Sequence, residues 1–251
     1  QGDQSMVFSL YETRQTLVFE NIHEPPVPSL LRGFSAPIRL NYDYSSNELA
    51  HLMANDSDGF NRWDAGQKLS LKVLNTLIED AIAERELVMD LQLITVLGDV
   101  LSDHSLDPAM VNLMLQLPSE AQLHEQAETI YVDAIHRARE FVRQSIANAL
   151  ESELAATYHR LTETQAYAPQ AEQIGRRALR NCALGYLMNV EGVGSELAWQ
   201  QFNDASNMTD KAAALSALVN CETAQDYAAQ ALKIFEQDYA DETLAMNLWL
   251  Q

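Results

Sequence analysis

Two short strings of the sequence approach a zinc-binding pattern without completing it. A His-Glu-x-x-His helix places two imidazoles on one face as zinc ligands and a glutamate beside them as a general base. The string at 23–27 reads His-Glu-Pro-Pro-Val, and its prolines exclude a helix. The string at 124–128 reads His-Glu-Gln-Ala-Glu and lacks the second histidine. The sequence therefore predicts no zinc site of this type.

One other pair of residues has the spacing of metal ligands on a helix. His136 and Glu140 are four positions apart, so a helix would place them on one face. A polar pair at the surface is the more common use of such spacing. Nucleophile elbows and phosphate loops do not occur, and the Gly-Val-Gly string at 192–194 follows a predicted helix instead of a strand. We therefore assign no catalytic, cofactor-binding or metal-binding residue to this chain.

The charge balance excludes several classes of partner. The chain has 251 residues, of which 16 are basic and 36 acidic, giving a net charge of -20. Such a surface repels phosphate backbones and anionic lipid, and no apolar run approaches the roughly 18 residues of a membrane helix. We expect neither a nucleic-acid nor a membrane partner. The only basic cluster, Arg176-Arg177-Ala178-Leu179-Arg180, is expected to form ion pairs between helices.

The two cysteines point to a reducing compartment. Cys182 and Cys221 lie in apolar helical patterns and are not spaced as Cys-x-x-Cys. Neither a disulfide framework nor a thiolate metal site is indicated. We expect two buried free thiols and a cytoplasmic location.

The first 45 residues have the pattern of β-strands. Alternating apolar residues and β-branched or aromatic residues predict strands at 5–11, 15–20 and 38–44. A proline-rich string at 23–28 separates the second strand from the third. Three strands leave hydrogen-bonding edges and one apolar face uncovered, so they do not form an independent domain.

From Ser46 the hydrophobic period becomes helical and stays so. Ser46 is expected to cap the first short helix, and Asp107 with Pro108 to begin another. The aromatic residues at 60, 63, 158, 186, 199 and 202 have spacings typical of core packing. In the longest helix an apolar stripe runs through residues 135, 142, 146, 150, 154 and 161. Predicted helices cover 61–85, 91–101, 107–116, 119–127, 133–164, 171–188, 195–205, 209–219 and 223–239.

These elements predict a mainly α fold in two parts. Residues 1–45 would be the C-terminal strands of an incomplete β-sandwich, and residues 46–251 a helical array that is truncated at its C-terminus. Short polar turns between helices favour antiparallel pairs stacked as an armadillo-like or HEAT-like α-solenoid. The apolar stretch at 246–250, with Leu248, Trp249 and Leu250 exposed, has no polar cap. We interpret the chain as a fragment whose uncovered surfaces favour self-association.

The sequence closely resembles the bacterial aminopeptidase N family of zinc exopeptidases. The matching blocks follow one another in order across essentially the whole chain, which makes the resemblance more specific than any single motif. They are Phe-Glu-Asn-Ile at 19–22, Pro-Ser-Leu-Leu-Arg-Gly-Phe-Ser-Ala-Pro-Ile at 28–38, Phe-Asn-Arg-Trp-Asp-Ala at 60–65, Ser-Leu-Asp-Pro-Ala at 105–109, Leu-Pro-Ser at 117–119, Arg-Ala-Leu-Arg-Asn at 177–181 and Gln-Phe-Asn-Asp-Ala-Ser-Asn-Met-Thr-Asp at 201–210.

The resemblance implies a non-catalytic role for this part of the family's chain. In the family the zinc motif and a Gly-Ala-Met-Glu-Asn substrate-anchoring motif belong to a separate catalytic domain. Neither motif occurs here, so no catalytic residue is carried over. The helical domain of the family closes over the catalytic cleft and gates the access of peptides. The implied partners are the parent's own catalytic domain and, in the full-length protein, its peptide substrates.

Two other functions remain open from the residues alone. An α-solenoid can serve as an independent protein-interaction scaffold without enzymatic activity. The incomplete sandwich at one end and the uncapped helix at the other argue against independence. A hydrolase with an unrecognised site would rest only on scattered carboxylates and histidines.

Overall fold

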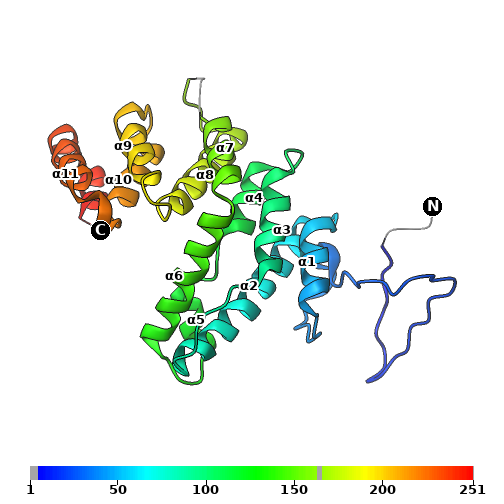
Figure 1. Ribbon diagram of the computed structural model, residues 1–251. Coiled ribbons are helices and arrows are strands. Elements are labelled where there is room, and N and C mark those ends of the chain that lie inside the picture. Colours follow the sequence, from blue (N-terminus) through cyan, green and yellow to red (C-terminus); the bar gives the residue numbers. More distant parts are fainter. Residues whose placement is uncertain (1–4, 163–165, 251) are drawn as a thin grey trace.

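The computed structural model describes residues 5–162 and 166–250 (Figure 1). Within these residues the regular elements are α-helices and short 3-10 helices, and no β-strand is present. In chain order they are η1 Arg32–Phe34, α1 Ser46–Asn55, α2 Gly59–Ile82, α3 Leu91–Ser102, α4 Pro108–Leu115, α5 Glu120–Gln126, α6 Val132–Ala149, α7 Glu151–Arg160, α8 Ala171–Leu187, α9 Gly194–Asp204, α10 Met208–Val219, η2 Glu222–Ala224, α11 Gln225–Tyr239 and α12 Thr243–Trp249.

The helices form an extended stack, which confirms the predicted mainly α fold. α1 packs on α2, α2 on α6, α4 and α7 on α8, α9 on α10 and α10 on α11. Figure 1 shows the order in space, from α1 to α4 near the N-terminal segment to α9 to α12 at the other end. Short connections place successive helices against each other, as in an α-solenoid.

A continuous apolar interior holds this stack together. In α2, Leu69, Val73 and Leu77 are buried as their spacing predicts, whereas Ile78 is half-buried. Complete burial of each such side chain stabilises the fold by about 1.5–3 kcal/mol. The stripe predicted for the longest helix is buried throughout: Ile135, Val142, Ile146, Leu150, Leu154 and Leu161.

Phe60 differs from the other aromatic residues predicted in the core, because 40% of it is exposed. Its ring contacts Phe34, with 4.4 Å between the ring centroids, outside the helical stack. The prediction of a core position for Phe60 is therefore wrong. The remaining five aromatics are buried or half-buried: Trp63, Tyr158, Tyr186, Trp199 and Phe202.

The N-cap of α1 lies one residue earlier than expected. Ser45, not Ser46, is the N-cap: its side chain accepts the Glu48 backbone N–H, and the Glu48 carboxylate accepts the Ser45 N–H. This capping box satisfies two helix-terminal donors at once. At α4 the expectation is confirmed, since Asp107 accepts the Ala109 N–H and Pro108 is the first helical residue.

The single long helix predicted over 133–164 is divided at Leu150. This residue leaves the helical region at φ -114° and ψ 23°, so α6 ends at Ala149 and α7 begins at Glu151. The buried stripe continues across the break. α6 packs mainly against α2 and also touches α8, whereas α7 packs mainly against α8 and also touches α3. The change of direction at Leu150 thus lets one apolar stripe cover different partners. The predicted end at Thr164 lies outside the described residues.

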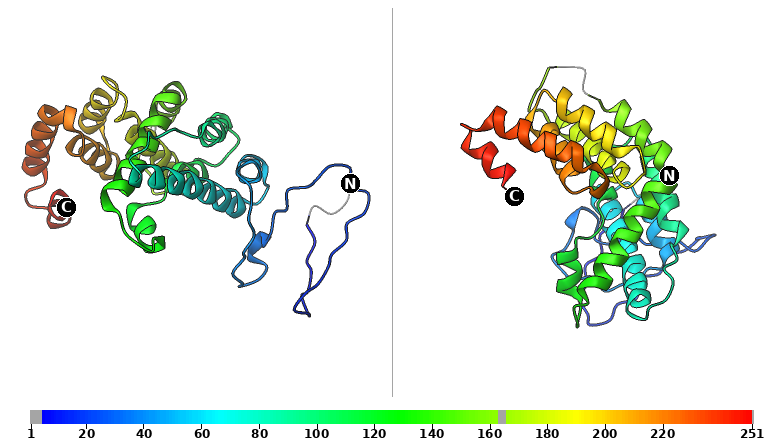
Figure 2. Two further views of the ribbon diagram at one scale, coloured as in Figure 1. Left: turned by 60° about the horizontal axis from the view of Figure 1, so that its bottom comes forward. Right: turned by 60° about the vertical axis from the view of Figure 1, so that its left-hand side comes forward.

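Residues 5–45 do not form the three predicted strands. Apart from η1 they are extended, and Figure 2 shows the segment leading away from the helices. Its apolar residues stay exposed, among them Val7 at 84% and Val18 at 79%. A strand needs a neighbouring strand to pair its backbone groups, and no such neighbour is present among the described residues.

The end of the stack is partly covered. The Trp249 indole N–H donates to the Leu232 carbonyl of α11 at 3.3 Å, and Trp249 is half-buried. The prediction that Trp249 is exposed is therefore wrong. Leu250 is exposed as predicted, and the side chain of Leu248 lies outside the described residues.

Candidate functional site

A polar cluster fastens the N-terminal segment to the first two helices; we call it the N-terminal joint. It comprises Ser29, Arg32, Asp56, Asp58 and Asn61 with the backbone between them. The Asp56 side chain is 1% exposed and accepts from the Arg32 guanidinium. It also accepts from Ser29 Oγ at 2.5 Å and from the Asp58 N–H at 2.9 Å. One buried carboxylate thus ties the segment to the junction of α1 and α2.

The rest of the joint satisfies the backbone of a sharp turn. Asn61 Nδ2 donates to Ser29 Oγ at 2.9 Å and to the Leu30 carbonyl at 3.0 Å. Asp58 accepts the Gly33 N–H at 2.9 Å. Leu31, Gly33 and Phe34 have φ values of 57°, 60° and 55°, a left-handed conformation that non-glycine residues rarely adopt. The surrounding hydrogen bonds hold this turn in place.

Tyr44 adds a second attachment between the segment and the helices. It is 5% exposed, and its hydroxyl donates to the Pro28 carbonyl at 2.8 Å. Burial raises the pKa of Tyr44 to about 12, with the neighbouring Tyr42 and Asp64 adding to the shift. The hydroxyl therefore keeps its proton, and with it this hydrogen bond, throughout the neutral pH range.

Replacement of Asp56 by alanine is expected to loosen the joint. The change removes the carboxylate that accepts from Arg32 and Ser29 in a partly buried place, at a cost of about 2–3 kcal/mol in the free energy of unfolding. Urea unfolding followed by circular dichroism measures this loss in the free energy of unfolding. Asp43→Ala is the matched control, because the Asp43 carboxylate is 97% exposed and, among the described residues, pairs only with Lys72 at 3.2 Å. Equal losses in the two variants would contradict this account of the joint.

A second buried polar cluster connects α8, α9 and α10. Asp210 is 3% exposed and lies 3.5 Å from the Arg180 guanidinium. It accepts from Asn181 Nδ2 at 3.0 Å, and the Asp210 carbonyl accepts from Gln201 Nε2 at 2.9 Å. The expected inter-helix ion pair of the basic run is confirmed at Arg180.

Within 5–162 and 166–250, the other two arginines of that run form hydrogen bonds to neutral oxygens and no ion pair. Arg177 is buried and donates to Gln173 Oε1 at 3.1 Å and to the Ala168 carbonyl at 3.4 Å. Arg176 donates to the Arg160 carbonyl at 3.5 Å. Arg176 thus bonds the end of α7, whereas Arg177 bonds a side chain of its own helix and the connection before it.

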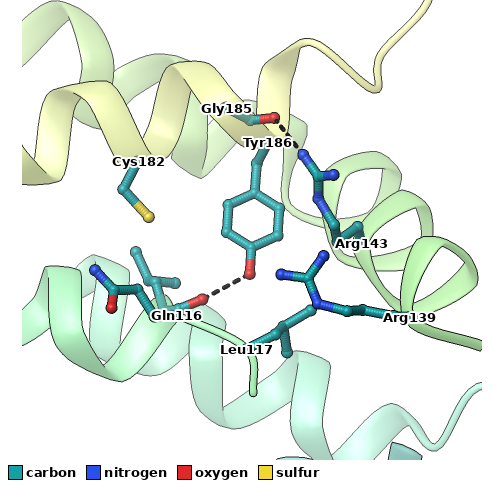
Figure 3. A pocket seen from close by; sticks show the side chains of 8 residues that line it. Gln116, Leu117, Arg139, Arg143, Cys182, Gly185 and Tyr186 are labelled. Carbon is teal, nitrogen blue, oxygen red and sulfur yellow. Dashed lines mark hydrogen bonds between the residues drawn. The ribbon is translucent and has the colours of Figure 1, made fainter. Parts of the chain in front are cut away.

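A cavity of about 440 Å³ lies where the end of α4 meets α6 and α8 (Figure 3). Arg139 and Arg143 enter it from successive turns of α6, and both guanidinium groups lie on the side of Tyr186 away from Cys182. The Tyr186 hydroxyl donates to the Leu115 carbonyl at 2.6 Å. The lining residues are Leu115, Gln116, Leu117, Arg139, Arg143, Cys182, Gly185 and Tyr186.

The cysteines are free but less buried than predicted. Both Cys182 and Cys221 are half-buried, Cys182 because it lines this cavity. Burial raises the pKa of the Cys182 thiol to about 12, and the nearby Arg143 only partly opposes the shift. The thiol is therefore protonated at neutral pH and a poor nucleophile.

His136 and Glu140, which have the spacing of metal ligands on a helix, each contact a different side chain. His136 Nδ1 is 2.8 Å from Glu120 Oε1 of α5, whereas Glu140 accepts from Arg143 Nη1 at 3.0 Å. His136 and Glu140 therefore have separate partners. Over 5–162 and 166–250, no group of three His, Cys, Asp or Glu residues could hold a metal ion. The residues present do not fit a zinc site, and within the same ranges no helix is long and apolar enough to cross a membrane.

Family models match both parts of the chain. A model described as a domain of unknown function with ARM repeats (DUF3458_C) covers residues 46–251. A model described as a domain of unknown function with an Ig-like fold (DUF3458) covers residues 1–43, which supports the assignment of this segment to a β-sandwich. The fold thus defines a class: an ARM-repeat helical array preceded by an Ig-like segment.

Three proteins that are similar to this chain are aminopeptidases. Aminopeptidase N of Escherichia coli is 37% identical over 85% of this chain and 24% of that protein. Aminopeptidase N of Haemophilus influenzae is 33% identical over 98% of this chain and 28% of that protein. The crystal structure of Legionella pneumophila aminopeptidase A in complex with aspartic acid superposes with a TM-score of 0.74 at 31% identity, covering 92% of this chain and 28% of that one.

The chain belongs to the bacterial aminopeptidase N family, as the resemblance of its motifs predicts. It spans about a quarter of the length of the curated relatives that it matches. The sequence does not predict the joint or the cavity, because each is assembled from residues far apart in the chain. Two of the family blocks, at 28–38 and 60–65, contain residues of the joint and are its signals in the sequence.

Proposed function

We propose that this chain is a non-catalytic C-terminal region of a zinc metallo-aminopeptidase that releases N-terminal amino acids from peptides. The observation that carries the proposal is the match to aminopeptidases over 85–98% of the chain. In this proposal residues 1–45 end a β-sandwich domain and residues 46–251 form the helical array. The zinc ion is held by a catalytic domain outside this chain, and the enzyme is cytoplasmic.

The role proposed for the array is to close over the catalytic cleft and to gate the access of peptides. A gate must keep a constant position relative to the domain that carries it. The N-terminal joint supports this requirement, since Asp56, Ser29 and Arg32 fix the end of the Ig-like segment on the first helices. The stacked helices with their continuous core supply a wall that does not deform easily.

The gate is tested in the full-length enzyme by comparing substrates of different size. We expect the wild type to cleave an aminoacyl p-nitroanilide and an unfolded peptide, and to leave the same N-terminal sequence intact on a folded protein. Asp56→Ala should keep the p-nitroanilide rate within about twofold while raising cleavage of the folded protein at least about tenfold, because a loosened joint admits larger substrates. The 251-residue chain alone should cleave none of them.

Asp43→Ala is the control and should resemble the wild type on every substrate. If Asp56→Ala changes all three rates by the same factor, the array does not gate. Chelator-sensitive turnover by the 251-residue chain would overturn its non-catalytic role.

The alternative is an independent α-solenoid scaffold without enzymatic activity, and it would be favoured if the sequence encoded upstream lacked a His-Glu-x-x-His motif. The exposed residues of the N-terminal segment favour self-association of the isolated chain, which light scattering would detect.

A further inference from the structure

The cavity between α4, α6 and α8 has spare hydrogen-bond donors. Arg139 and Arg143 are four residues apart on α6 and point into the same space (Figure 3). Arg139 uses Nε to bond the Pro118 carbonyl at 3.0 Å, and no hydrogen bond joins its Nη atoms to the described residues. A guanidinium has five N–H donors and no acceptor, so this wall of the cavity attracts anions.

The backbone acceptors around the same space already have partners. The Leu115 carbonyl accepts from the Tyr186 hydroxyl at 2.6 Å, and the Gly185 carbonyl accepts from Arg143 Nη2 at 3.4 Å. The Gln116 carbonyl accepts from Gln67 Nε2 at 2.8 Å. An incoming molecule therefore meets two guanidinium groups, of which Arg139 has free Nη donors, and their positive charge disfavours a cation.

Glu140 shows how the two arginines hold a carboxylate. Its Oε1 lies 3.0 Å from Arg143 Nη1 and 3.7 Å from Arg139 Nη1. Two guanidinium charges against one carboxylate leave a local charge of about +1 in a chain whose net charge is -20. One further negative charge is thus balanced, whereas a dianion would be repelled by Glu140.

Apart from Gln116 and Gly185, the remaining wall is mainly apolar. Leu115 ends α4 and Leu117 follows it, and the Tyr186 ring and the protonated Cys182 thiol line the cavity from α8. We propose that this cavity binds an organic monocarboxylate with an apolar substituent, the carboxylate on Arg139 and Arg143 and the substituent against Leu117 and Tyr186. A volume of about 440 Å³ is in the range of small-ligand sites.

The source of the carboxylate, a peptide C-terminus or a released amino acid, rests on the proposed function, whereas the binding itself does not. The two sources differ in the α-nitrogen, which is a neutral amide in a peptide and an ammonium in a free amino acid. The ammonium would lie near two guanidinium groups. N-acetyl-leucine and leucine therefore represent the two sources, and N-acetyl-leucinamide lacks the carboxylate of both.

The test is a titration of the 251-residue chain observed by the backbone amide signals of Leu117, Gly185 and Tyr186. We expect saturable shifts with N-acetyl-leucine or leucine and none with N-acetyl-leucinamide. Stronger binding of N-acetyl-leucine identifies a peptide end, and stronger binding of leucine a released amino acid. An equal response to the amide, or no localised response to either acid, overturns the proposal. Loss of gating in the full-length enzyme would leave this result unaffected, so the two proposals fail separately.

Substitutions separate a binding role from a structural one. Arg143→Gln should weaken binding about tenfold or more, because a charge-assisted hydrogen bond is lost. Glu140→Gln should tighten binding several-fold, because the competing carboxylate is removed. Arg85→Gln, which changes an exposed arginine paired with Asp80 at 2.6 Å, should bind as the wild type does. Unchanged binding in both Arg143→Gln and Glu140→Gln would overturn the assignment, and thermal unfolding checks that each variant folds.

Discussion

Replacement of Gly194 by alanine is expected to destabilise the array by about 3 kcal/mol or more. Gly194 begins α9 directly over the end of α8, and an added Cβ would lie 2.4 Å from the Leu187 carbonyl oxygen and 2.4 Å from Met188 Cα. These neighbours are backbone atoms, so the clash cannot be relieved by turning a side chain. The start of α9 must move away from α8, and the packing between them is lost.

The measurement is thermal unfolding, in which such a loss lowers the midpoint by roughly 6–12 °C for a chain of this size. Gly185→Ala is the matched control. Gly185 lies on α8, and an added Cβ there meets no described atom within 4 Å. Alanine favours the helix over glycine by up to about 1 kcal/mol, so this control should raise the midpoint slightly. A midpoint for Gly194→Ala equal to that of the wild type would show that α9 does not depend on this close approach.

Replacement of Phe202 by alanine is expected to cost about 3–5 kcal/mol. Phe202 lies in α9 and is fully buried. Its ring stacks on Trp199 with 6.1 Å between centroids, and Lys211 Nζ of α10 lies 5.0 Å from the ring centroid. Removing the ring leaves a cavity between α9 and α10 and also removes the cation–π contact. Urea unfolding, with hydrogen exchange of the α9 and α10 amides, measures both the global and the local effect.

Phe34→Ala provides the comparison for this loss. The Phe34 side chain is 70% exposed and lies in the turn of the joint, so its removal should cost less than about 1 kcal/mol. Equal losses for Phe202→Ala and Phe34→Ala would mean that burial does not govern the stability of this array. A loss confined to α9 and α10 in hydrogen exchange would instead indicate that the end of the stack opens as a unit.

The helices and the family can be recognised from local sequence patterns. Apolar residues at helical spacing and local caps such as Asp107-Pro108 depend on residues within four positions of one another, so they can be recognised without a structure. The predicted helix bounds after residue 170 therefore differ from the observed ones by only a residue or two, and the ordered motif blocks identified the aminopeptidase family.

Features that depend on residues far apart in the chain emerge only when the helices pack together. Leu150 interrupts the long helix because α6 and α7 pack on different partners, and no Gly or Pro marks the break. The strand-like N-terminal segment stays unpaired, because strands form only against neighbours that alternation in the sequence does not supply. The joint brings Ser29 to Asp56, and the cavity brings Leu115, Arg139 and Cys182 together. These contacts arise from packing between separate helices, whereas hydrophobic periodicity reports only which face of each helix is buried.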